Sequence, residues 1–85
     1  MSGAKYEYYF IIEVDGVIKS VISKGNKPNR YGDPKKFGSL KVAKDWVTKH
    51  SYKGMSHYYK IMAAPYGNEI PECVYNQKEE KKKIE

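Results

Sequence analysis

Basic side chains interleaved with aromatic rings are the pattern of this 85-residue chain that is best suited to binding a ligand. Lysines and one arginine alternate with two aromatic residues in segment 27–37 (KPNRYGDPKKF), and a second such group lies at 53–60 (KGMSHYYK). Lysines along phosphates and rings against bases hold single-stranded nucleic acid, with each stacked base worth roughly 1–3 kcal/mol. The ordinary alternative is that tyrosines are half-buried sheet residues, which we expect for Tyr6, Tyr8 and Tyr59.

Positive charge is concentrated in the middle of the chain. Between residues 16 and 62, eleven basic residues face only Asp33 and Asp45, a net charge of +9 in a chain whose total is +6. Such a segment attracts a polyanion over roughly a Debye length, about 8–10 Å. Arg30 is the only arginine, and lysine holds a phosphate backbone better than it reads base edges. We therefore predict weakly specific nucleic-acid binding. The predicted binding residues are Lys24, Lys27, Arg30, Tyr31, Lys35, Lys36, Lys41, Lys44, Lys53, Tyr58 and Lys60.

Metal, nucleophilic and cofactor chemistry lack the residue patterns that they need. His50, His57 and Cys73 have no ligand spacing such as C-x-x-C or H-x-x-x-H, so we expect no metal site. Cys73 falls on a predicted edge strand, where a lone cysteine is usually a small apolar residue. Asp45 is expected to pair with Lys49, one helical turn away. No glycine-rich phosphate loop is present. We predict that the chain is not an enzyme and takes no cofactor.

The first half of the chain predicts a β-hairpin. Residues 6–14 (YEYYFIIEV) are rich in β-branched and aromatic residues, and residues 17–24 return as the second strand after an Asp15-Gly16 turn. This register places Val14 opposite Val17. The expected core face consists of Tyr8, Phe10, Val14, Val17 and Val21. The second face carries Tyr9, Ile11, Ile18 and Ile22. We expect this second face to contact a partner, or to be covered by the tail or by the long loop.

The second half predicts one helix and two further strands. Residues 24–38, fifteen in number, are rich in Gly, Pro and Asn and predict a long loop. Residues 39–50 predict a helix that Ser39 caps. The arc expected to face the sheet contains Leu40, Val42, Ala43, Trp46, Val47 and His50. Strands are expected at residues 56–63 and 69–75, the latter at a sheet edge because of Pro71.

The order of these elements is β-β-α-β-β. It predicts an α+β domain over residues 1–75, a small antiparallel sheet with one amphipathic helix packed on one face. Residues 76–85 are charged and lack apolar periodicity, so we expect a flexible tail there.

Two resemblances accompany these patterns. The run KKFGSLKVAKDWVTKH at 35–50 resembles the F-x-[ST]-x-x-x-A-x-x-W hairpin-to-helix junction of integrase arm-type DNA-binding domains. That resemblance covers residues 6–50, and the strand expected at 56–63 departs from it because those domains end on the helix. The short length and the richness in Lys and Tyr also resemble small early accessory proteins of T-even phages. Some of those bind RNA and antagonise host defence ribonuclease toxins. No residue roles follow from this compositional resemblance.

These features predict a small accessory protein that binds nucleic acid, RNA in preference to DNA. The phage resemblance implies inhibition of a host ribonuclease toxin. Two alternatives stay open: a protein–protein inhibitor or dimeric module that uses the apolar second face, and an arm-type duplex DNA binder. A host protein and a second copy of the chain therefore stay open as partners. With a single cysteine, no signal-peptide pattern and no apolar run of about 20 residues, we expect no membrane contact and a cytoplasmic location, the host cytoplasm if a phage encodes the chain.

Overall fold

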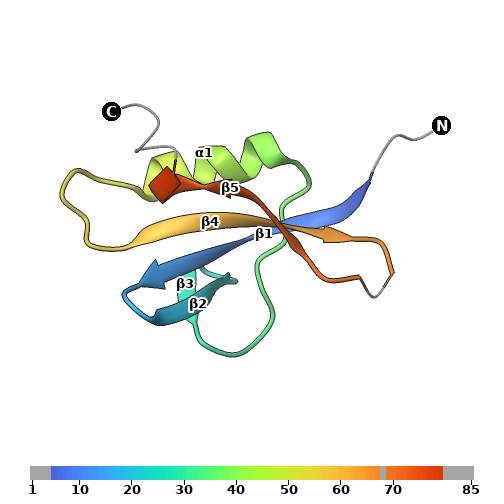
Figure 1. Ribbon diagram of the computed structural model, residues 1–85, viewed down its shortest axis with the longest axis horizontal. Helices are drawn as coiled ribbons and strands as arrows, with labels where there is room; N and C mark the ends of the chain where they lie inside the picture. The colour runs from blue at the N-terminus through green and yellow to red at the C-terminus, as the bar shows by residue number, and fades with distance from the viewer. Residues whose placement is uncertain (1–4, 68, 80–85) are drawn as a thin grey trace.

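The computed structural model describes residues 5–67 and 69–79, which form a five-stranded antiparallel sheet with one helix (Figure 1). The elements are β1 (Tyr6–Asp15), β2 (Ile18–Ser23), β3 (Lys27–Asn29), α1 (Leu40–His50), β4 (Tyr58–Pro65) and β5 (Glu72–Asn76). The strands lie side by side in the order β3-β2-β1-β4-β5. The predicted α+β class is therefore confirmed. Within the described part of the chain, no helix is long and apolar enough to cross a membrane.

Gly16 and Val17, and not Asp15 and Gly16, form the turn of the first hairpin. Asp15 pairs with Ile18, so every pair of the hairpin lies two residues away from the predicted register. Gly16 has a φ of +63° while Val17 is not among the residues with positive φ, which fits a type II′ turn. A shift of two residues changes the partners of each side chain but leaves it on its predicted face.

The face predicted to contact a partner is instead the core of the domain. Ile11 is 0% exposed and Ile22 is 1% exposed, and Ile61 of β4 lies directly opposite Ile11. The buried cluster is completed by Phe37, Ala43, Trp46, Val47 and Tyr59. The prediction was wrong because both hairpin faces are apolar, so the alternation alone could not show which of them the single helix covers. The protein–protein alternative loses the surface on which it rested.

The helix forms where the sequence predicts it. The side-chain oxygen of Ser39 accepts a hydrogen bond from the backbone N–H of Val42 at 3.2 Å, which confirms the N-cap. The helix ends at His50 because Ser51 is extended, and the Ser51 N–H turns back to the carbonyl of Thr48. Lys49 and His50 in the last turn suit the negative end of the helix dipole.

Two details of the helix surface differ from the prediction. Val42 was expected on the buried arc, but 52% of it is exposed. It lies at the margin of the arc, where the sheet does not reach. Asp45 pairs with Lys41 at 4.0 Å, one turn before it, and no ion pair with Lys49 is observed in the described residues. Both partners of this pair are largely exposed, so it adds little to stability.

The segment 24–38 is more ordered than the predicted structureless loop. β3 lies within it and pairs with β2. Further along, Tyr9 and Phe37 exchange two backbone hydrogen bonds of 2.9 and 2.8 Å, and the Lys35 N–H donates to the Ile22 carbonyl at 2.7 Å. The Gly and Pro content of the segment marks its turns correctly. It could not reveal that the backbone between the turns would complete two strand edges.

β5 lies at the edge of the sheet, as the position of Pro71 predicts. Asn76 is its last residue, and Gln77 beyond it is buried. The Gln77 side chain accepts from the Tyr59 N–H at 3.0 Å and donates to the Ser51 hydroxyl at 2.9 Å. Asn76 and Gln77 therefore belong to the fold and not to the predicted tail, whose residues 80–85 lie outside the described residues.

Two isoleucine-to-alanine substitutions, one at a buried position and one at an exposed position, test which residues form the core. Ile11→Ala should lower the free energy of unfolding by about 2–5 kcal/mol, because it leaves a cavity in the core. Ile18→Ala should cost about 1 kcal/mol or less, because 45% of Ile18 is already exposed. Urea unfolding of both variants measures the difference. Equal losses would contradict the assignment.

Candidate nucleic-acid interface

The sheet face opposite the helix combines aromatic rings with lysines. Residues that pair across antiparallel strands share a face, and alternate residues of one strand share a face. The pairs Phe10–Met62, Ile12–Lys60 and Val14–Tyr58 therefore place these side chains together, away from the helix. The open face, as we call it, comprises Tyr8, Phe10, Ile12, Val14, Lys19, Val21, Ser23, Lys27, Asn29, Tyr58, Lys60, Met62, Ala64, Cys73 and Asn76. None of these residues is acidic.

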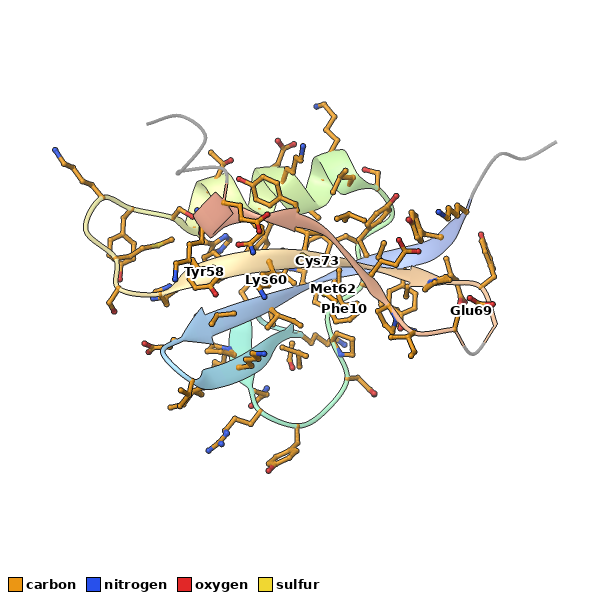
Figure 2. All side chains as sticks on the ribbon, in the orientation of Figure 1. Phe10, Tyr58, Lys60, Met62, Glu69 and Cys73 are labelled. Atoms are coloured by element: carbon orange, nitrogen blue, oxygen red, sulfur yellow. The ribbon has the colours of Figure 1, made fainter. Side chains whose placement is uncertain are left out.

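The central side chains of the open face are neither buried nor fully exposed. Tyr58, Lys60 and Met62 follow one another along β4, with Phe10 opposite Met62 on β1 and Cys73 opposite Met62 on β5 (Figure 2). All of these except the exposed Cys73 are half-buried. A ligand laid on this face would remove the remaining apolar surface from water, at about 25 cal/mol per Å².

Lysine ammonium groups lie over the rings of the open face. The Nζ of Lys36 lies 4.8 Å from the centre of the Tyr8 ring, and the Nζ of Lys78 lies 5.4 Å from the centre of the Tyr58 ring. These cation–π contacts keep positive charge next to flat apolar surface. The Tyr8 ring in turn lies 6.2 Å from that of Phe10, tilted by 47°. Flat rings flanked by cations can accept a base and its phosphate together.

The structure distributes the eleven predicted binding residues over several surfaces. Lys27, Tyr58 and Lys60 are on the open face, and the ammonium group of Lys36 lies over the Tyr8 ring of that face. Lys24, Arg30 and Tyr31 lie at the β3 end of the sheet, in the turn before β3 and in the connection after it. Lys41 and Lys44 project from the helix, and Lys53 follows it. Lys35 lies between the helix and the sheet, where it hydrogen-bonds Asn26.

Sequence reasoning missed several residues of the open face. Tyr8 and Phe10 were placed in the core, and Lys19, Met62 and Lys78 were not selected. The signal was present in the alternation of β1, in which the even residues form one row. It was misassigned because Glu7 and Glu13 interrupt the odd row, whereas the even row contains no charged residue in β1.

A groove runs between the helix and the connection that precedes it. Its volume is about 430 Å³, and its lining residues are Lys35, Lys36, Phe37, Gly38, Val42, Asp45, Trp46 and Lys49. Asn26, in the turn before β3, forms hydrogen bonds with two residues that line the groove. Its side-chain oxygen accepts from the Lys35 ammonium at 2.7 Å and from the Trp46 indole at 2.9 Å. Asn26 adopts a φ of +63°, which asparagine tolerates better than most residues.

The titratable residues near the core serve packing. The ring nitrogen Nε2 of His57 lies 3.2 Å from the Tyr59 hydroxyl and 3.8 Å from a Glu13 oxygen. Burial raises the pKa of Tyr59, and the nearby Glu13 and Tyr52 raise it further. Tyr59 therefore stays protonated well into the alkaline range, where it keeps its packing against Trp46. Among residues 5–67 and 69–79, no group of three or more His, Cys, Asp and Glu side chains could hold a metal ion.

Replacing Asn26 tests whether its two side-chain hydrogen bonds stabilise the fold. Asn26→Gly keeps the positive φ but removes the shared acceptor, which leaves the Trp46 N–H without its partner. The free energy of unfolding should fall by about 1–3 kcal/mol. Asn26→Asp, which retains a side-chain oxygen, should lose much less. Urea unfolding followed by Trp46 fluorescence compares the two, and similar losses would rule out the hydrogen bonds as the cause.

The chain was compared with protein-family models, with curated proteins and with solved structures, and none of them matches it. What the chain binds must therefore be inferred from the chemistry of its own surfaces. Two of these surfaces combine aromatic or apolar residues with lysines: the open face of the sheet and the groove beside the helix.

Proposed function

We propose that this protein binds single-stranded nucleic acid across the open face of its sheet, with RNA preferred to DNA. The observation that carries the proposal is the composition of that face. Its register brings Tyr8, Phe10 and Tyr58 together with lysines and with no carboxylate. Lysines neutralise phosphates, and rings stack on bases without regard to their identity.

A single strand fits this face better than a duplex does. The bases of a single strand are free to turn toward the rings, whereas those of a duplex are stacked on one another. The near absence of arginine points the same way, because bidentate reading of guanine in a major groove is arginine chemistry. Binding with little sequence preference is the expected result.

The preference for RNA rests on the amide side chains of the face. Asn29 of β3 and Asn76 of β5 lie on the open face, toward its two edges. An amide both donates and accepts hydrogen bonds, as the ribose 2′-hydroxyl does, and this hydroxyl is what distinguishes RNA from DNA. Inhibition of a host toxin, which the compositional resemblance implies, stays an expectation because no contact described above bears on it.

Removing one ring from the open face tests base stacking. Phe10→Leu keeps an apolar side chain on the sheet but removes the aromatic surface, so affinity for a short RNA should fall by about 1–3 kcal/mol. Tyr66→Leu is the matched control, since Tyr66 is 56% exposed and follows β4 outside the open face. Fluorescence anisotropy with a labelled RNA, and urea unfolding as a check of folding, provide the measurements. Equal affinities of the two variants would contradict stacking on this face.

Salt dependence tests the lysines separately from the rings. Affinity for single strands should fall with a log–log slope of roughly −0.7 for each phosphate contacted. Lys60→Gln should make this slope shallower by about 0.7, because one contact is lost. Thr48→Glu changes the net charge by the same amount from an exposed position on the helix. It should leave the slope unchanged, and a common change in both variants would indicate a general charge effect.

A further inference from the structure

The groove between α1 and the connection before it is separate from the open face and differs from it in character. Its walls are apolar, formed by Phe37, Val42 and Trp46. Phe37 and Trp46 meet edge to face, with ring centres 6.5 Å apart, and only 6% and 7% of these residues remain exposed. Val42 on the helix is half exposed although it is aliphatic. The volume of about 430 Å³ lies within the usual range of pockets for small organic ligands.

The rim of the groove is positively charged. Lys35, Lys36 and Lys49 line it, and Asp45 is the single acidic residue of the lining. The carboxylate of Asp45 has Lys41 at 4.0 Å, which offsets its charge. An apolar slot with a cationic rim is complementary to a ligand that has a flat apolar part and an attached anion.

We propose that the groove holds one unstacked nucleotide of the bound strand. Its base lies against Val42 and the exposed margins of Phe37 and Trp46, and its phosphate lies at the rim beside Lys49, the rim lysine whose ammonium group is not already directed to Asn26 or to Tyr8. This inference rests on the proposed function and adds a second, distinct contact to it.

Lys36 connects the groove to the open face. Its side chain belongs to the lining of the groove, and its ammonium group lies over the Tyr8 ring of the open face. The neighbouring Phe37 is directed into the core and Lys35 lies 5.7 Å from the Phe37 ring, so consecutive residues of this segment alternate between the two sides. A strand that leaves the open face at Tyr8 can therefore pass Lys36 on its way to the groove.

Trp46 reports on the groove directly because it is the only tryptophan of the chain. Uridine monophosphate and adenosine monophosphate, added to the unlabelled protein, should quench its fluorescence in a saturable way. Uridine without phosphate should bind roughly tenfold more weakly or worse, since one hydrogen bond to a charged group is worth about a factor of ten or more. Ribose 5-phosphate, which lacks the base, should produce no quenching. Quenching that does not saturate, or equal effects of nucleotide and ribose 5-phosphate, would overturn the inference.

Two substitutions on the helix locate the effect. Val42→Glu introduces a carboxylate into the groove from an exposed position where glutamate favours helix, so the protein should fold and nucleotide quenching should disappear. Lys49→Gln should weaken nucleotide binding roughly tenfold, because it removes the cation that holds the phosphate. Thr48→Glu, which matches the charge change of Lys49→Gln outside the groove, should leave the nucleotide affinity unchanged. Equal effects of Lys49→Gln and Thr48→Glu would overturn the inference.

The outcomes separate this inference from the proposed function. If Phe10→Leu weakens RNA binding while mononucleotides leave Trp46 unquenched, the groove is not a nucleotide site and the open face still binds RNA. If the protein binds no RNA at low salt, both proposals fail. A short acidic peptide with an aromatic residue serves as the competitor. Saturable quenching by this peptide, with none by nucleotides, would assign the groove to a protein ligand and overturn the inference.

Discussion

The indole of Trp46 is the contact on which the rest of the domain depends. Its ring stacks on His50 at 4.0 Å and meets Tyr59 of β4 edge to face at 5.2 Å. Its N–H donates to Asn26 in the turn before β3. One side chain thus joins the helix to the central sheet and to the β2–β3 turn. Among the described residues only three aromatic side chains are buried, namely Phe37, Trp46 and Tyr59, so one of these rings takes a large share of the packing.

One helix cannot cover both faces of a five-stranded sheet. α1 is 11 residues long, and its buried residues reach only the face that carries Ile11, Ile22 and Ile61. On the other face Val14 is buried, but the rings and most aliphatic groups stay half exposed, with lysines among them. An exposed apolar face on a small protein commonly marks a binding surface, and lysines on that face suit an anionic ligand. This is the physical basis of the proposed function.

The short segment from Lys35 to Phe37 divides the two candidate surfaces. Because it pairs with β1 at Tyr9, its side chains alternate as those of a strand do. Phe37 packs in the core, while Lys36 lies over the Tyr8 ring of the open face and also lines the groove. A loop without this pairing would leave both lysines free in solvent, with no defined relation to the rings.

Elements that depend on neighbouring residues could be predicted from the sequence alone. The helix cap at Ser39, the strands on either side of the helix, the edge position of β5 and the basic character of the middle of the chain all follow from neighbouring residues. Which face of the hairpin is buried could not be predicted from the sequence. Both rows of β1 are apolar, and the buried row is the one on the face against which the helix packs. Tertiary contacts also ordered the segment 24–38, because its backbone hydrogen bonds go to strands far away in the chain. For the same reason, only some residues of the open face could be selected from the sequence. Charge and aromatic content can be read along the chain, but the face on which they meet is set by the pairing of β1 with β2 and β4.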